Sequence, residues 1–353
     1  MTMNLLSDFD TRHNQFLSKL EDHALDGFLT SKTENLKYLF NIECSAGFAL
    51  TFEGSSTLIV DSRYINQAQN QSLHCQVELA SDGLEKAIQT QLNTKKGSLG
   101  FEANHLPYRT ASILKESGPN LDLIGQEQLI EELRQIKSLA ELEKIRHAFQ
   151  TALSVHDSVF GDISLWGKSE SEIAARLDFE MRLAGSERPA FETMVLSGPR
   201  SAQPHSRPSY NPIDNNSPLL VDFGAVIDGY HSDNTRIHLP SGLDQLEILD
   251  IVQEAQDRAI EAIKPGIPAF ELDKIARQFI TERGFGNNFG HGLGHGLGLA
   301  VHELPRINAS SNVLLEEGMV FTVEPGIYIP DVFGVRLEEA VIVTSKGCDV
   351  LSG

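Results

Sequence analysis

Two acidic residues, Asp222 and Asp233, stand within a segment that otherwise has the composition of a β-hairpin. The segment is LLVDFGAVIDGYHSDNTRI (219–237), with an apolar run on each side of a turn signal at Asp228-Gly229. Pairing of the two arms is expected to bring the acidic residues within about one residue of opposite positions. Like charges held close together on one sheet face destabilise the sheet, so this spacing predicts a counter-charge nearby.

A second segment repeats the arrangement. In MVFTVEPGIYIPDVFGVRLEEAVIV (319–343), Glu324 and Glu338 are equidistant from Asp331, and the turn formers Pro330-Asp331 and Gly334 lie between them. Four carboxylates among β-branched and aromatic neighbours need a strong counter-charge. A pair of divalent cations is the simplest one.

A glycine-rich stretch, GHGLGHGLGLAVHE (290–303), lies between the two acidic segments and carries His291, His295 and His302. The glycines disfavour a helix, so a strand or loop is expected here. The zincin pattern H-E-x-x-H and the dinucleotide pattern G-x-G-x-x-G both fail. Glycines at this density are expected to let the backbone pass close to a ligand or a metal. The joint pattern predicts a carboxylate-rich site for two metals.

The elements that must position these residues form two domains, 1–130 and 131–353. The first alternates short strands with helices, which indicates an α/β domain, and Gly54 marks a hairpin between two of its strands. Its expected strands are 24–29, 47–52, 56–60 and 97–101, and its expected helices are 63–72 and 83–92.

The second domain begins with a capping box, Ser138 to Glu141, at the start of a helix. Further helices are expected at 171–184, 243–263 and 269–283. The order is helix, helix, hairpin, and then helix, helix, glycine-rich segment, hairpin. This order predicts an internal duplication of αα–β units.

Composition excludes several classes of protein. The 353 residues carry a formal net charge of −20, which argues against nucleic acid or an anionic membrane as partner. The cysteines (Cys44, Cys75 and Cys348) have no C-x-x-C spacing, so neither a disulfide scaffold nor a zinc knuckle is predicted. No secretory signal or membrane span is recognisable, and a soluble, cytoplasmic protein is expected.

These motifs resemble those of the metallopeptidases with the "pita-bread" fold, the M24-type family of Xaa-Pro dipeptidases (prolidases) and Xaa-Pro aminopeptidases. The resemblance rests on DFGAVIDGYHSDNTR, HGLGHGLGLAVHE, VEPGIY and GVRLEE, and upstream on SGPRSAQPH (197–205). NLKYLFNIECSAG (35–47) and VDSRYINQA (60–68) are similar to the creatinase-like N-terminal domain of those enzymes. The resemblance covers nearly the whole chain. It implies an α/β (α+β) protein, with a creatinase-like α/β domain followed by a pita-bread domain with a pseudo-twofold duplication.

The resemblance also implies a set of metal ligands. Asp233 and Glu338 would bridge two ions, Asp222 would complete one site, and His295 with Glu324 would complete the other. Oxygen-rich ligation with one imidazole suits Mn²⁺ or Co²⁺ and could also admit Zn²⁺ or Fe²⁺.

The activity implied is hydrolysis of the bond before proline at the N-terminus of short peptides. Two cations would lower the pKa of a water and polarise the scissile carbonyl, and Glu324 would accept the proton of that water. His205 and His302 match histidines that contact the substrate and stabilise the tetrahedral intermediate. His291, Arg336 and Tyr328 are further candidates for the substrate pocket, with Arg336 placed to hold either a ligand carboxylate or the substrate's C-terminus. The resemblance implies a homodimer.

Several alternatives stay open at this stage. Dipeptide and longer substrates are not distinguished, nor are the preferred first residue and the native metal. A non-catalytic pita-bread binding module and a metal-free creatinase-type amidinohydrolase are the rival functions. Both usually lack the acidic ligand set that is intact here. Ile42-Glu43-Cys44 departs from the family pattern in a loop that helps to choose substrates.

Overall fold

The computed structural model describes residues 2–162, 166–204, 206–240 and 246–351. The chain divides into two compact units, Met1–Arg134 and Gln135–Gly353. The division falls four residues after the boundary predicted at residue 130 (134 − 130 = 4).

The N-terminal unit is built on a mixed six-stranded sheet with the strand order β4-β3-β2-β1-β5-β6. The strands β2 and β3 form the predicted antiparallel hairpin, and Glu53 and Gly54 at its turn both have positive φ. The strands are β1 (Gly27–Thr30), β2 (Gly47–Phe52), β3 (Ser55–Val60), β4 (Gln76–Leu79), β5 (Gly97–Glu102) and β6 (Leu121–Gln126). The helices are α1 (Thr2–Asp22), α2 (Thr33–Phe40), α3 (Ile65–Gln71), α4 (Leu84–Leu92), α5 (Tyr108–Ser117) and α6 (Leu129–Leu133).

The C-terminal unit contains the predicted duplication. Its first module consists of α7 (Leu139–Asp162), α8 (Glu170–Leu183), β7 (Met194–Ser197), the 3₁₀ helix η1 (Gly198–Ala202), β8 (Leu219–Phe223), β9 (Val226–Ile227), β10 (Tyr230–His231) and β11 (Asn234–His238). The capping box at the start of α7 is present, because the Glu141 amide donates to Ser138 Oγ and the Ser138 amide donates to Glu141 Oε2.

The second module repeats the helix pair and the hairpin. It consists of α9 (Glu247–Glu261), α10 (Ala269–Glu282), η2 (Gly286–Asn288), β12 (Gly294–Gly296), β13 (Glu303–Ile307), β14 (Val320–Val323), β15 (Gly326–Ile329), β16 (Phe333–Arg336), β17 (Glu339–Val343) and β18 (Cys348–Val350). Residues 243–245 of the helix predicted at 243–263 lie outside the described residues.

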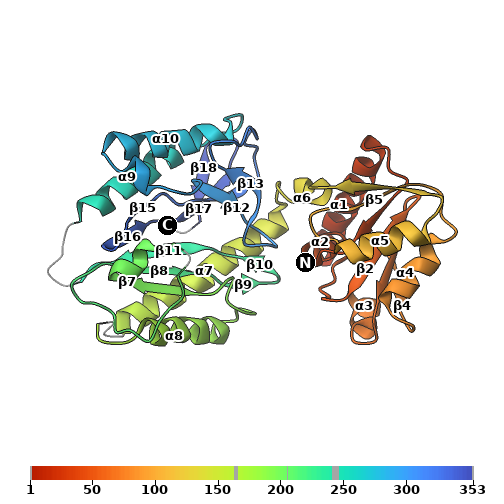
Figure 1. Ribbon diagram of the computed structural model, residues 1–353, viewed down its shortest axis with the longest axis horizontal. Helices are drawn as coiled ribbons and strands as arrows, with labels where there is room; N and C mark the ends of the chain where they lie inside the picture. Colours follow the sequence, from red (N-terminus) through yellow and green to blue (C-terminus); the bar gives the residue numbers. More distant parts are fainter. Residues whose placement is uncertain (1, 163–165, 205, 241–245, 352–353) are drawn as a thin grey trace. The chain divides into compact units, whose positions relative to one another are not determined.

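The two helix pairs of the C-terminal unit lie on opposite sides of its strands (Figure 1). The pair α7 and α8 packs on the first hairpin through a core that includes Leu177, Val221 and Phe223. The pair α9 and α10 packs on the second hairpin through a core that includes Val252 and Phe321. Burial of one apolar face by each helix pair stabilises this arrangement and leaves the strands between two helical layers.

Within the described part of the chain, no helix is both long enough and apolar enough to cross a membrane.

Candidate metal centre

The first hairpin presents Asp222 and Asp233 as buried side chains. Asp222 lies on β8 and pairs with Thr235, so Asp233, just before β11, is two residues away from the position opposite Asp222. The offset is larger than expected, because the turn is a two-residue loop in which Asp228 and Gly229 both have positive φ. The hairpin is therefore centred between Asp228 and Gly229. The carboxylates of Asp222 and Asp233 are diagonal neighbours in the hairpin.

The second hairpin has the symmetry predicted for it. Gly326 pairs with Arg336 and Val323 pairs with Glu339, so a single register centred on Asp331 runs through both ladders. Continuation of this register places Glu324 opposite Glu338 where the ladder is interrupted. Pro325, which has no amide hydrogen to donate, follows Glu324 at the interruption. The acidic pair therefore occupies the gap between two hydrogen-bonded ladders.

His295 lies on β12, with a glycine on each side. A methyl group at position 294 would lie 1.8 Å from the Thr322 carbonyl oxygen, and one at position 296 would lie 2.1 Å from the Leu304 carbonyl oxygen. These glycines thus permit close approach to the backbone of the neighbouring chain segments. The expectation of a strand or loop in this stretch is confirmed, with β12 as the strand.

The imidazole of His295 faces the acidic residues with its Nε2 atom. Its Nδ1 lies 3.1 Å from the Gly296 carbonyl oxygen, which can only accept, so Nδ1 carries the proton. Burial lowers the pKa of His295 to about 4, and the ring is therefore neutral at pH 7. Its Nε2 lone pair lies 3.3 Å from Glu324 Oε1 and 3.7 Å from Asp233 Oδ2. A divalent cation placed between these three electron-rich atoms would be attracted to all of them.

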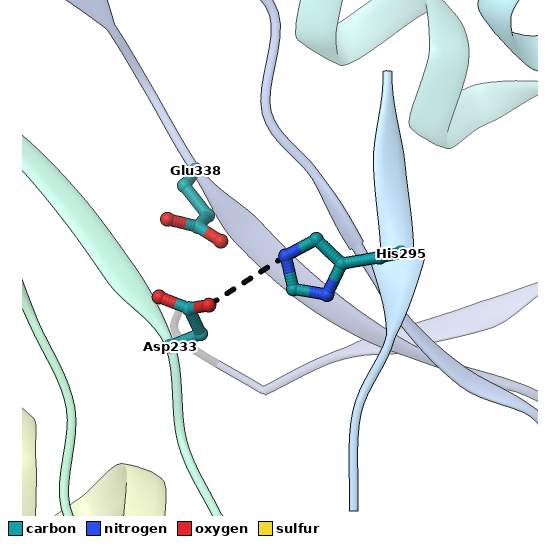
Figure 2. Close-up of side chains that lie close together, drawn as sticks. All are labelled: Asp233, His295 and Glu338. Carbon is teal, nitrogen blue, oxygen red and sulfur yellow. Dashed lines mark ion pairs between the residues drawn. The ribbon is translucent and has the colours of Figure 1, made fainter. Parts of the chain in front are cut away.

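Asp233, His295 and Glu338 approach one another from three different segments (Figure 2). One ligand atom from each lies within 4.8 Å of the others. Burial, and then the neighbouring carboxylates, raise the pKa of both Asp233 and Glu338 well above the ordinary range. Among the described residues, no hydrogen-bond partner contacts the buried Glu338 Oε1. A carboxylate-rich donor set with an orphaned oxygen and an imidazole lone pair fits divalent metal ions.

Arg336 supplies positive charge on one side of the cluster. Its Nη2 contacts Asp222 Oδ2, its Nη1 donates to Tyr328 Oη over 3.0 Å, and its Nε donates to Thr235 Oγ1 over 3.0 Å. The Thr235 hydroxyl in turn donates to Glu338 Oε2 over 2.8 Å. Arg336 is 4% exposed. Its donor groups therefore orient Asp222 directly and Glu338 through a hydroxyl.

Removal of this buried guanidinium is expected to destabilise the metal-free protein. Arg336→Met keeps the length of the side chain but leaves Asp222 buried without its charged partner, a loss that typically costs about 3–5 kcal/mol. Arg336→Lys keeps the charge without the planar fork and is expected to be intermediate. Urea unfolding of the metal-free proteins measures the difference. Arg258→Met, which removes an exposed ion pair with Glu254, is the matched control and should change little.

The remaining predicted residues lie at different distances from the cluster. The rings of His302 and His295 pack edge to face, with centroids 4.2 Å apart, and His302 is exposed. His291 Nε2 lies 3.0 Å from the hydroxyl of Tyr328, which is buried. Glu324 Oε1 accepts from Thr322 Oγ1 over 3.2 Å. His205 lies outside the described residues.

Two threonines of the site were not identified from the sequence. Thr235 and Thr322 each lie two positions from a predicted ligand on an extended segment, Asp233 and Glu324 respectively. Side chains two positions apart on a strand lie on the same face of the sheet. The spacing of two from a predicted ligand was therefore the sequence signal that could have identified these threonines.

The chain is similar to known proteins over both of its compact units. Residues 143–345 match the model of metallopeptidase family M24, and residues 12–136 match that of the Creatinase/Prolidase N-terminal domain. A prolidase structure from Pyrococcus horikoshii superimposes with a TM-score of 0.92 at 36% identity, covering 97% of this chain and 98% of that one. An X-Pro aminopeptidase from Thermotoga maritima gives 0.85 at 34% identity, covering 94% and 96%.

Similarity at the level of sequence is equally extensive. A Xaa-Pro dipeptidase from Pyrococcus furiosus is 36% identical over 344 residues, which is 97% of each chain. Duplicated αα–β modules around buried carboxylates, preceded by a creatinase-type domain, define a metallopeptidase with the pita-bread fold. The chain belongs to metallopeptidase family M24.

Proposed function

We propose that this protein hydrolyses the peptide bond before proline at the N-terminus of short peptides, as a Xaa-Pro dipeptidase or Xaa-Pro aminopeptidase. The observation that carries the proposal is the cluster of Asp233, His295 and Glu338, in which one ligand atom of each residue lies within 4.8 Å of the others. The similarity to Xaa-Pro dipeptidases over nearly the whole chain supports the choice of substrate. A bond before proline is a tertiary amide without an N–H, so a dedicated pocket is chemically reasonable.

The proposed ligands are Asp222, Asp233, His295, Glu324 and Glu338. Two divalent cations, when bound, would supply Lewis acidity and lower the pKa of a water. Glu324 would accept a proton at a carboxylate oxygen, and its Oε1 is oriented by the Thr322 hydroxyl. Asp222 would be held in place by Arg336. We propose Mn²⁺ or Co²⁺ as the ions, because the donor set is rich in oxygen and lacks thiolate.

The substrate would contact histidines at the edge of the cluster. His302 is exposed, and its ring packs against that of His295, so a peptide at the edge of the cluster would lie beside it. His291 and Tyr328 would form part of the pocket wall, and His205 completes the proposed set. Arg336 is engaged with Asp222, Tyr328 and Thr235. We therefore propose that it orients ligands and does not bind the substrate's C-terminus.

Hydrolysis of Ala-Pro and of Ala-Pro-Ala by metal-stripped protein, with and without added Mn²⁺ or Co²⁺, tests the proposal. Metal-dependent release of alanine from the dipeptide alone is the result expected of a dipeptidase, and cleavage of the tripeptide is that expected of an aminopeptidase. Asp233→Asn protein purified in parallel controls for contaminating peptidases. Cleavage of neither peptide by the metal-loaded protein would overturn the proposal.

We also propose that the protein acts as a cytoplasmic homodimer, the assembly that the family resemblance implies. Light scattering of the purified protein gives the mass to compare with 38.9 kDa for one chain. A mass of one chain would contradict this.

A further inference from the structure

The chain that leads into the His295 strand consists of alternating glycines. Gly290, Gly292 and Gly294 occupy every second position from Phe289 onward. Glycine loses more conformational freedom on ordering than any other residue, so this segment needs contacts from outside to hold one conformation. The five residues Phe289–Leu293 are here called the lead segment.

The helix α10 supplies those contacts through an ion pair. Arg277 and Asp273 form a bidentate pair, with Nε–Oδ2 and Nη2–Oδ1 both at 2.8 Å. From this position Arg277 donates to the Phe289 carbonyl over 2.9 Å and to the His291 carbonyl over 2.6 Å. Its guanidinium also lies 4.3 Å from the centroid of the Phe289 ring. One side chain thus fixes two alternate carbonyls of the lead segment.

Asp273 fixes the other end of the segment. Its side chain is 1% exposed, and its Oδ1 accepts from the Leu293 amide over 3.0 Å. The Leu293 carbonyl accepts from the amide of Glu324, a proposed ligand, over 2.8 Å. Leu293, which Asp273 holds, is therefore hydrogen-bonded to Glu324 and stands two residues before His295.

The lead segment carries chemistry of its own. His291 Nδ1 lies 2.8 Å from the Gly292 carbonyl oxygen, which can only accept, so Nε2 is the acceptor for the Tyr328 hydroxyl. Tyr328 in turn accepts from Arg336. The position of the His291 ring depends on the backbone of residues 291 and 292. Arg277 holds the carbonyl of residue 291.

We propose that Asp273 and Arg277 are positioning residues for the reaction. They act on the lead segment and through it set the places of His291, His295 and Glu324, although neither touches the metal cluster. This inference rests on the proposed function for its kinetic readout. The ion pair on α10 thereby fixes the geometry of the glycine-rich chain that enters β12.

Kinetics of metal-loaded variants test the inference. Arg277→Ala is expected to lower kcat for Ala-Pro about 10- to 100-fold at saturating metal, because displacements of about 1 Å at reacting groups have effects of this size. Added guanidinium ion at millimolar concentration should restore part of the lost rate, and Arg277→Lys should retain more activity than Arg277→Ala. Asp273→Asn provides a second variant if Arg277→Ala does not fold. Lys274→Ala, which removes the exposed pair with Glu271 on the same helix, is the matched control.

A purely structural role would give a different pattern. It would lower the melting temperature but leave kcat unchanged at temperatures where the variant is folded, and guanidinium would not restore activity. Normal kcat in folded Arg277→Ala would overturn the inference.

A measurement without turnover separates this inference from the proposed function. Hydrogen exchange of the peptide that covers residues 289–294 should be faster in Arg277→Ala than in the wild-type protein, and unchanged in Lys274→Ala. Unchanged exchange in Arg277→Ala would contradict the proposal that the Asp273–Arg277 pair holds the lead segment. Inactivity of the wild-type protein on every Xaa-Pro peptide, with faster exchange in Arg277→Ala, would contradict the proposed peptidase function. It would still support the proposal that the ion pair holds the lead segment.

Discussion

Glu338→Gln and Asp233→Asn are each expected to lose at least about 1,000-fold in kcat/KM toward a Xaa-Pro peptide while remaining folded. Each substitution keeps the size of the side chain and removes a negative charge from the centre of the cluster. Charge stabilisation by a bound metal is worth several kcal/mol, and each 1.4 kcal/mol corresponds to about a factor of ten in rate. Steady-state kinetics at several metal concentrations, with metal analysis of the dialysed proteins, measure the effect.

Glu339→Gln is the matched control for this experiment. Glu339 is adjacent to Glu338 but forms an ion pair with Arg236, 3.4 Å away. Its loss should leave most of the activity. Full activity in Glu338→Gln or Asp233→Asn would contradict the assignment of these two residues as shared ligands. Equal losses in Glu338→Gln and Glu339→Gln would instead indicate a general effect of charge on this strand.

The metal-free wild-type protein is expected to lose stability as the pH rises above about 4, and the double variant Asp233→Asn/Glu338→Gln is expected to lose much less. Burial and neighbouring carboxylates raise the pKa of both groups above their ordinary values of 3.8 and 4.5. The folded state therefore binds more protons than the unfolded state between those values and the raised ones. Within this window each pH unit lowers the free energy of unfolding by about 1.4 kcal/mol per titrating group.

Thermal unfolding from pH 4 to 8, in the presence of a chelator, measures this difference. At pH 7 to 8 the metal-free double variant should melt at a higher temperature than the metal-free wild-type protein, because it carries two fewer buried like charges. Added Mn²⁺ should raise the melting temperature of the wild-type protein and have little effect on that of the variant. Parallel pH profiles for the two metal-free proteins would show that these carboxylates do not cause the loss of stability with rising pH.

The hairpins were predictable because their signals are local. Asp228-Gly229 is a strong two-residue turn, and apolar runs of matched length flank it, so the hairpin was predictable, although Asp233 lies two residues from the position opposite Asp222 and not within one as expected. The position of Asp331 at the centre of the second hairpin followed in the same way. The capping box at Ser138 is equally local, and so are the ends of the helices predicted at 171–184 and 269–283, since a glycine with positive φ follows each of them. The duplicated αα–β order needed only these signals.

Contacts between the modules had no such signature. Arg336 meets Asp222 across a separation of 114 residues, and Thr235 meets Glu338 across 103. Asp273 and Arg277 lie within the helix predicted at 269–283, but nothing local shows that a loop 12 to 20 residues later would return to them.

The N-terminal helix α1 was missed for a different reason. Its buried residues Phe9, Phe16 and Leu20 are sparse within a polar sequence, and a helical period is difficult to detect from so few positions.

The mirror placement of Glu324 and Glu338 about Asp331 restricts where the length of this segment can change during evolution. Residues added at the tip lengthen both arms beyond the acidic pair and leave the two carboxylates facing each other at the base. A single residue added within one arm would shift that arm by one position and turn its side chains to the opposite face. Relatives of this chain should therefore differ in length at the tip, near Asp331. Within the arms, β14 and β17, the number of residues should stay constant.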